Sequence, residues 1–311
     1  MTINLNNHRV PDRHRRWAQF RTEKEQKYRR RYGGSDWRRD PFGSMVWLLS
    51  WAIRLTGFYK RGLRNALNIT LKTMEMSSPD LPRAFDGYRI LHISDLHLDF
   101  FPDVGKALID ALSSVEAELC VFTGDFQGRF FGDVHHTMKD LTPVLSSIRA
   151  QDGILSVLGN HDSIRLLAPL EEEGVVVLVN ETLTLHREED TIQITGLDDV
   201  HDFYTEMAVE ALQESLAPYK ILLVHSPHFA RRAAIEGFHL YLCGHTHGGQ
   251  ISLPGNIPVA TRMKGNRAYA SGYWRIEKMR GLTSNGVGVS ILPLRFNAPS
   301  EIHLITLKRR P

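Results

Sequence analysis

Metal-binding side chains follow five short β-forming runs of the sequence, each in a turn that comes directly after the run. They lie in the segments Asp95-Leu96-His97, Gly124-Asp125, Gly159-Asn160-His161-Asp162, His225 and Gly244-His245-Thr246-His247. Because ligand sites of α/β sheets gather at the carboxyl ends of strands, we expect the five segments to meet at one edge of a sheet. These residue types predict a shared site for metal ions.

The ligand types indicate two divalent ions. Carboxylate, amide and imidazole ligands without a thiolate suit Mn, Fe or Zn, whereas Mg prefers oxygen ligands and water. Two cations about 3.5–4 Å apart need a bridging carboxylate, because they otherwise repel each other strongly. In an extended segment, residues i and i+2 point to the same side, so Asp95 and His97 could reach one ion, as could His245 and His247. Glycines at 124, 159 and 244 would permit tight turns and close backbone approach.

Each candidate ligand has a simpler interpretation when it is taken alone. Asp95, Asp125 or Asn160 could occupy a turn or cap a helix. Their joint spacing with four histidines favours the metal site. The other histidines match no segment and are interpreted as surface or core residues, except that His228, close to His225, could make a secondary contact.

Strands and helices alternate along the part of the chain that carries these segments. The β-rich runs lie at 88–94, 118–124, 153–159, 220–226 and 238–244, and the helical patterns lie at 104–114, 135–149, 204–215 and 229–236. Residues 175–196 resemble a hairpin, and strands are expected again at 251–253, 267–274 and 301–307. This order predicts an α/β sandwich with mixed sheets.

The order D-x-H, G-D, G-N-H-D, H and G-H-x-H over residues 95–247 resembles the signature of the calcineurin-like metallophosphoesterases. The resemblance implies a four-layer sandwich of two mixed β-sheets flanked by helices. It also implies hydrolysis of a phosphodiester or pyrophosphate bond, by attack of a hydroxide held between two divalent metal ions (Mn, Fe or Zn).

The resemblance also implies a role for each matching residue. One metal ion would be held by Asp95, His97 and His247. The second would be held by Asn160, His225 and His245, and Asp125 would bridge the two. The expected catalytic residues are His161, which would contact the phosphoryl oxygen and protonate the leaving group, and Asp162, which would orient His161.

The C-terminal part resembles one bacterial branch of the family. Residues 244–255 (GHTHGGQISLPG), 267–274 (RAYASGYW) and 284–307 are similar to membrane-associated phosphodiesterases that include UDP-2,3-diacylglucosamine hydrolases of lipid A synthesis. This likeness implies a lipid-linked substrate, such as UDP-2,3-diacylglucosamine or a phospholipid. Arg129, Arg267 and Tyr269 are candidates to line the substrate pocket.

The charge of the chain is strongly asymmetric. Residues 1–72 carry a net charge of +12, and the remainder carries −9. We expect a basic, partly disordered or helical tail at 1–44, an amphipathic membrane-surface helix at 45–72 and a catalytic domain at 80–311. The apolar run at 45–59 is shorter than the roughly 20 residues of a spanning helix, and with its flanking cations it is typical of a helix in a membrane interface. The same helix could instead pack on the core of the protein.

The predicted partners are therefore an anionic membrane surface, contacted by residues 1–72, and a lipid-linked phosphate. The predicted location is the cytoplasmic face of a bacterial inner membrane, with Arg38 and Arg39 a weak alternative signal for twin-arginine export. Nucleic acid is disfavoured by the acidic catalytic part, and no obligate protein partner is indicated. A nuclease or cyclic-nucleotide phosphodiesterase, and a metal-binding membrane protein without catalysis, are the alternative functions.

Overall fold

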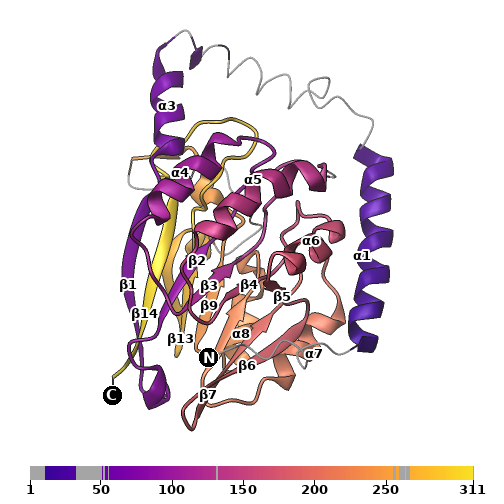
Figure 1. The fold of residues 1–311 in the computed structure, drawn as a ribbon, viewed down its shortest axis with the longest axis vertical. Coiled ribbons are helices and arrows are strands. Elements are labelled where there is room, and N and C mark those ends of the chain that lie inside the picture. The colour runs from indigo at the N-terminus through magenta and orange to yellow at the C-terminus, as the bar shows by residue number, and fades with distance from the viewer. Residues whose placement is uncertain are drawn as a thin grey trace.

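The computed structural model describes residues 11–32, 51, 53–54, 56–130, 132–254, 257–258, 263 and 267–310. Two six-stranded sheets face each other, and helices cover the outer face of each sheet (Figure 1). The expected class, an α/β sandwich of two mixed sheets flanked by helices, is confirmed.

The first sheet has the strand order β1-β14-β2-β3-β4-β5. Strands β2 to β5 are parallel, as successive strand–helix units require, while β14 runs antiparallel to β2 and parallel to β1. The strands are β1 (Thr70–Ser78), β2 (Arg89–Ile93), β3 (Leu119–Phe122), β4 (Ile154–Ser156), β5 (Val175–Val177) and β14 (Glu301–Arg309).

The second sheet has the order β12-β13-β9-β8-β7-β6, with antiparallel pairs at its two edges. A separate two-stranded ladder joins β10 and β11. The strands are β6 (Glu181–Arg187), β7 (Asp190–Gly196), β8 (Lys220–Leu223), β9 (Leu240–Cys243), β10 (Ser252–Leu253), β11 (Ile257–Pro258), β12 (Gly272–Ile276) and β13 (Met279–Thr283).

Alternation along the strands divides the core into layers. In β3, Leu119 and Val121 join the apolar cluster between the two sheets, whereas Cys120 and Phe122 join the cluster under the helices. Successive side chains of a strand point to opposite faces, so a strand covered on both faces is apolar throughout. This is why the strands that precede the ligand segments appear as continuous apolar runs.

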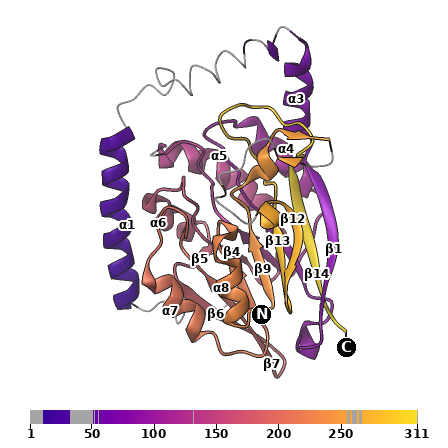
Figure 2. The ribbon, with the colours of Figure 1, turned by 180° about the vertical axis from the view of Figure 1, so that it is seen from behind.

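Helices α4, α5 and α6 pack on the outer face of the first sheet, and α7 and α8 pack on the second (Figure 2). The bounds of α4, α5, α7 and α8 agree with the predicted helical patterns to within a few residues, whereas α6 was not predicted. The helices are α1 (Pro11–Tyr32), α3 (Phe58–Leu67), α4 (Asp103–Leu112), α5 (Val134–Ser147), α6 (Leu167–Glu172), α7 (Glu206–Glu214) and α8 (Ala230–Ile235). Short 3₁₀ turns are η3 (Arg83–Phe85), η4 (Ile164–Leu166), η5 (Pro227–Phe229), η6 (His247–Gly249) and η7 (Arg267–Tyr269).

The N-terminal region departs from the single helix that the sequence predicts over 45–72. Residues 33–50, 52 and 55 lie outside the described part of the chain, helix α3 ends at Leu67, and β1 begins at Thr70. Strand β1 pairs with β14 along its whole length, so the sheet of the catalytic fold begins before residue 80. No helix among the described residues is long and apolar enough to cross a membrane.

The expected strand at 267–274 is only partly correct. Residues Arg267–Tyr269 form a 3₁₀ turn, and the strand begins at Gly272. Gly272 has φ 72°, a left-handed conformation that glycine adopts at little cost. The strand begins at this residue and not at Arg267. Strand β13, which follows it, was not predicted because the run MRGLT contains Arg280 and Gly281.

Candidate metal centre

The five ligand segments meet where the carboxyl ends of the two sheets come together. Asp95, Asp125 and Asn160 follow β2, β3 and β4 of the first sheet, while His225 and His245 follow β8 and β9 of the second. All five residues are at least 95 % buried. The site thus lies between the sheets, as the positions of the segments after strands predict.

Left-handed backbone conformations aim the ligands. Among the described residues, Asp95, His97, Asp125, His245 and His247 have φ of 53°, 47°, 57°, 73° and 53°. The extended geometry expected for the D-x-H and H-x-H pairs is therefore wrong. Asp95 and His97 do meet in one group of ligand atoms, whereas His247 joins that group and His245 lies beside Asn160. Positive φ in residues other than glycine is uncommon, and clusters of such residues mark functional sites.

Asp95, His97 and His247 form one compact group of ligand atoms, all within 4.8 Å of one another. The Nε2 atoms of His97 and His247 are 3.0 Å apart, and His247 Nε2 is 3.5 Å from Asp95 Oδ1. The group matches the residues that the family resemblance implies for the first metal ion.

Asp125 lies between the two groups of ligands. Its Oδ2 atom is 3.2 Å from Nε2 of His225 and 3.6 Å from Nε2 of His97. Nearby, His245 Nδ1 is 3.0 Å from Asn160 Oδ1. This position between imidazoles of both groups suits a carboxylate that bridges two ions.

The hydrogen bonds of the site fit bound cations. The Nδ1 atom of His225 donates to the carbonyl of Thr123 at 2.7 Å, which leaves the lone pair on Nε2. Nε2 of His225 faces the Asp125 carboxylate, whereas Nε2 of His245 is buried and has no hydrogen-bond partner among the described residues. A buried polar atom without a partner is costly, and coordination of a metal ion removes that cost.

Charges within the site are strongly coupled. Burial raises the pKa of Asp95 to about 6, and repulsion from Asp125 adds to the effect. Burial also acts on Asp125, but the nearby His225 and His161 hold the pKa of its carboxyl well below the usual range. One carboxylate is therefore kept ionised at the centre of the site, where the ligands of both groups meet.

Asp162 makes other contacts than those its expected role requires. The ring of His161 is held by its Nδ1 atom, which donates to the carbonyl of Gly128 at 2.8 Å. The carboxylate of Asp162 instead faces backbone amides, and its Oδ1 accepts from that of Gln127 at 3.0 Å. Its Oδ2 accepts from the amides of Asp125 and Gly159, each at 2.8 Å. The prediction that Asp162 orients His161 is therefore wrong; the carboxylate instead ties the two loops together.

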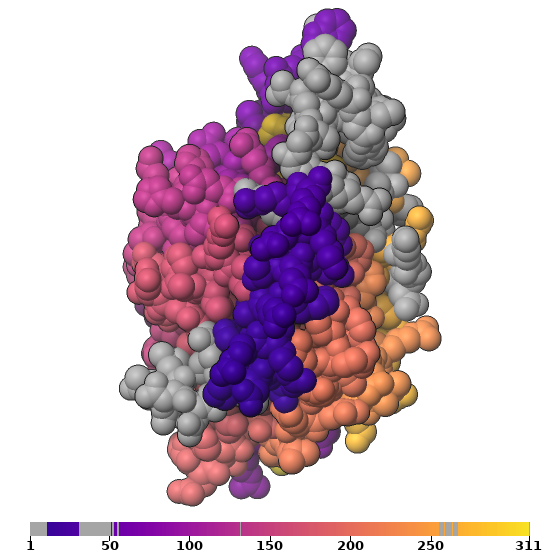
Figure 3. Space-filling model, turned by 90° about the vertical axis from the view of Figure 1, so that its right-hand side faces the viewer, coloured from indigo at the N-terminus to yellow at the C-terminus, as the bar shows by residue number. Residues whose placement is uncertain are grey.

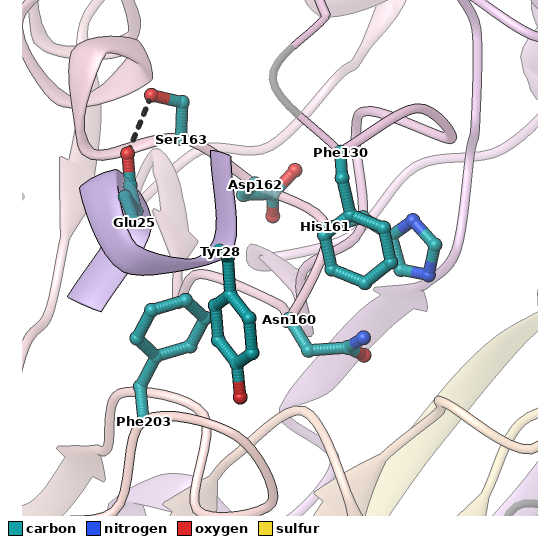
Figure 4. Close-up of a pocket in the computed structure, with 8 residues that line it drawn as sticks. All are labelled: Glu25, Tyr28, Phe130, Asn160, His161, Asp162, Ser163 and Phe203. Carbon is teal, nitrogen blue, oxygen red and sulfur yellow. Dashed lines mark hydrogen bonds between the residues drawn. The ribbon is translucent and has the colours of Figure 1, made fainter. Parts of the chain in front are cut away.

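A small pocket opens beside Asn160 and His161 (Figure 4). Phe130 forms one wall, with its ring stacked on His161 at 4.1 Å between centroids. Tyr28 of α1 and Phe203 form the opposite wall, with their rings edge to face at 6.0 Å. Sequence reasoning missed these aromatic residues because no local pattern connects α1 to the ligand loops.

The predicted pocket residues Arg129, Arg267 and Tyr269 do not line this pocket. Arg129 and Arg267 are exposed, and Tyr269 packs its ring on Trp274 at 4.8 Å. These three residues were chosen for their basic or aromatic side chains, and residue type alone does not tell in which direction a side chain points.

A third group of possible ligands lies close by and was also not predicted. Asp199, His201 and Asp202 have ligand atoms within 4.8 Å, and the ring of His201 is 4.9 Å from that of His245. The Asp199 carboxylate accepts the backbone N–H groups of His201 and Asp202. This carboxylate therefore has the contacts of a turn residue. The sequence suggested a secondary contact for His228, and the ring of His228 lies 4.8 Å from that of His201.

Comparison with known proteins agrees with this geometry. A sequence model described as "Calcineurin-like phosphoesterase" matches residues 88–249. The uncharacterized metallophosphoesterase YkuE of Bacillus subtilis is 34% identical over 73% of this chain and 82% of its own. Phosphodiesterase YaeI of Escherichia coli is 24% identical over 71% and 82%. The "Transmembrane protein with metallophosphoesterase domain" of Bos taurus is 30% identical over 80% of this chain, which spans 60% of it.

The chain belongs to the calcineurin-like phosphoesterase family and is a metal-dependent phosphoesterase. Bound divalent ions in such a site supply Lewis-acid stabilisation and an activated water. Asp95, His97 and His247 would hold one ion, and Asn160, His225 and His245 the other, with Asp125 between them. His161, fixed through Nδ1, would present Nε2 to exchange a proton with the leaving group.

Proposed function

We propose that this enzyme hydrolyses a phosphodiester or pyrophosphate bond of a lipid-linked substrate at an anionic membrane surface. Phospholipids and UDP-2,3-diacylglucosamine are substrates of this class. The phosphodiesterase name of the relative YaeI is consistent with the bond type. The observation that carries the proposal concerns one end of the molecule. This end carries exposed apolar and basic side chains, and hydrogen bonds connect it to a loop that holds a metal ligand.

That end includes α3 and Trp51. Trp51 and Phe58 are 56 % and 54 % exposed, and α3 stands at one end of the molecule, away from α7 and α8 (Figure 1). The Phe58 ring contacts Phe296 at 6.4 Å between centroids. Leu253, 55 % exposed, lies two residues beyond Ile251, which forms a bridge with Phe296. Exposed apolar side chains grouped in this way mark an interaction surface.

Exposed basic residues lie in the same segment as Trp51 and Phe58. The exposed basic residues of this segment are Arg54, Lys60, Arg61 and Arg64. Each basic side chain near an anionic leaflet adds roughly 1 kcal/mol of binding free energy, and exposed aromatic side chains insert at the headgroup level. A phospholipid surface satisfies both features at once.

Arg295 connects this end to the metal centre. Its backbone N–H donates to the Gly62 carbonyl of α3 at 3.1 Å, and its carbonyl accepts from Asn65 Nδ2 at 2.9 Å. Its fully buried guanidinium reaches the carbonyl and Nδ1 of His247, each at 3.4 Å. The segment that carries the exposed apolar and basic side chains is therefore tied directly to the loop of a metal ligand.

The test compares vesicle binding and turnover of the full chain with those of Trp51→Ser/Phe58→Ser. Leu216→Ser/Ile235→Ser is the matched control, because these two residues are 85 % and 79 % exposed near α7 and α8. We expect wild type and control to co-sediment with vesicles containing anionic phospholipid and to cleave a lipid phosphodiester there. The α3 variant should lose both, yet still cleave soluble bis-p-nitrophenyl phosphate.

Equal vesicle binding by all three proteins would overturn the proposal that Trp51 and Phe58 bind a membrane surface. Efficient cleavage of single-stranded DNA, with no cleavage of lipid phosphodiesters, would instead assign the site to nucleic acid.

A further inference from the structure

Helix α1 lies along the seam between the helices of the two sheets. In Figure 3 it runs between the surface of residues near 130–180 and that of residues near 200–250. Arg13, Trp17 and Arg21 follow one another at intervals of four residues, which places them on one face, and all three are buried. The face turned to the protein therefore contains two arginines, although the helix as a whole is highly charged.

Arg21 is fully buried against the ligand loops. Its Nη2 atom donates to the carbonyls of Gly159 at 2.8 Å and Asp162 at 2.6 Å. Its Nη1 atom forms an ion pair with the buried Asp198, whose other oxygen accepts from Nε1 of Trp17 at 2.6 Å. The guanidinium also lies 3.7 Å from the ring centre of Phe203.

The two carbonyls that Arg21 binds stand on either side of Asn160 and His161. Asn160 offers Oδ1 to the second group of metal ligands, and His161 offers Nε2 to the leaving group. A planar guanidinium that holds both ends of this short loop fixes the direction of both side chains, as a flexible ammonium does not. Glu25, one turn further along α1, accepts from Ser163 Oγ at 3.0 Å and from the Ile164 amide at 2.7 Å.

We propose that Arg21 is a positioning residue of the active site, and that α1 is part of that site although it lies outside the residues 88–249 matched by the family. Arg21 holds the loop of Asn160 and His161 in the geometry that binds the second metal ion and presents the proton. This inference rests on the metal-dependent phosphoesterase activity but not on the lipid substrate.

A helix that merely stabilises the fold would make some of the same contacts, so the variants must separate the two roles. Removing Arg21 alone would leave the carboxylate of Asp198 buried without its partner, which destabilises a protein for reasons unrelated to catalysis. Arg21→Met/Asp198→Asn removes both charges and the two loop contacts together. Arg21→Lys keeps the charge, but its single nitrogen atom replaces both Nη1, which pairs with Asp198, and Nη2, which donates to the two carbonyls.

Arg13→Met is the matched control on the same helix. Arg13 is buried to a similar degree, donates to the Asn180 carbonyl at 3.1 Å and pairs with Glu214. None of its contacts involves the loop from Gly159 to Asp162. Its replacement weakens the docking of α1 without touching the loop.

The experiment measures Mn²⁺ stoichiometry and affinity by calorimetry, the thermal midpoint, and kcat and KM for bis-p-nitrophenyl phosphate. Loss of a group that orients ligands typically lowers metal affinity or activity 10- to 100-fold. We expect about this loss in the affinity of one of two Mn²⁺ ions and in kcat for Arg21→Met/Asp198→Asn. Arg21→Lys should lie between it and wild type, and Arg13→Met should keep both values while its thermal midpoint falls.

The proposal is overturned if folded Arg21→Lys and Arg21→Met/Asp198→Asn bind two Mn²⁺ ions and turn over substrate like Arg13→Met. Should the double variant not fold, Arg21→Lys decides, since it keeps the charge. A wild-type protein that binds two ions but hydrolyses no phosphodiester would contradict the proposed function alone. In that case the calorimetric comparison still tests the role of Arg21.

Discussion

The Nε2 atoms of His97 and His247 lie 3.0 Å apart, although 150 residues separate them in the chain. Burial lowers the pKa of both rings, that of His97 to about 3, so both are neutral at physiological pH. The two neutral rings direct nitrogen atoms toward each other, beside a carboxylate oxygen of Asp95. A cation bound by all three groups stabilises this arrangement. The pair is thus the part of the site most directly built for a metal ion.

Removal of metal should destabilise the whole protein. Because the ligands come from both sheets, bound ions cross-link them, and ligand at 100 times its dissociation constant stabilises by about 2.7 kcal/mol. We expect EDTA to lower the thermal midpoint of wild type and added Mn²⁺ to restore it. The midpoint of Asp125→Asn should respond to neither, and a wild type that is equally insensitive would contradict a metal centre.

Replacement of His161 should separate proton transfer from metal binding. General acid–base catalysis typically contributes 10²–10⁴-fold, so His161→Asn should lower kcat by roughly that factor. Its metal content, measured by atomic emission, should stay at the wild-type level because His161 is not among the residues expected to hold the ions. His228→Asn is the control, and an equal loss of activity in both variants would count against the assigned role.

Glycine at 159 is required by space rather than by its backbone angles. A Cβ atom there would collide with the carboxylate of Asp125. Gly159→Ala should therefore abolish binding of at least one metal ion and inactivate the enzyme. At Gly174, φ is 81° and a Cβ would meet nothing within 4 Å, so Gly174→Ala should cost about 1 kcal/mol of stability and keep activity. Full metal occupancy in Gly159→Ala would contradict the collision between a Cβ atom at 159 and the Asp125 carboxylate.

Acid should destabilise the protein in part through His303. Burial lowers the pKa of His303 from 6.5 to about 3, so the folded state favours the neutral ring. The resulting stability is complete above pH 6.5 and declines as the pH falls toward 3, by about 1.4 kcal/mol per pH unit. Urea unfolding of His303→Leu should show a pH slope smaller by up to this amount. Identical slopes in the variant and wild type would show that His303 does not titrate on unfolding.

The ligand set was predictable because each ligand follows directly after its own strand. Asp95, Asp125 and Asn160 come at the ends of apolar runs, and the turn glycines at 124 and 159 mark where each run stops. Such local signals do not require knowledge of which strands pair. The position of these residues after the strands was thus predicted correctly, whereas the left-handed backbone angles of Asp95 and Asp125 were not.

Contacts between distant parts of the chain could not be predicted. Strand β1 lies in a basic, amphipathic stretch, and its identity depends on pairing with β14, which begins at Glu301. Arg21 and Tyr28 lie in a helix whose charge indicates a solvated surface, yet both reach residues near 160 or 203. The role of Asp162 was wrongly assigned because adjacency in sequence to His161 does not determine which amides its carboxylate meets.

The most direct test of the account is hydrolysis of bis-p-nitrophenyl phosphate by wild type and Asp125→Ala, with Mn²⁺ and with EDTA, alongside the metal content of each protein. Asp125 is the carboxylate that stands between both groups of ligands. We predict Mn²⁺-dependent hydrolysis and two bound ions for wild type, and loss of both for Asp125→Ala. Activity that survives EDTA, or an Asp125→Ala protein with two ions and wild-type turnover, would contradict a two-metal centre built on Asp125.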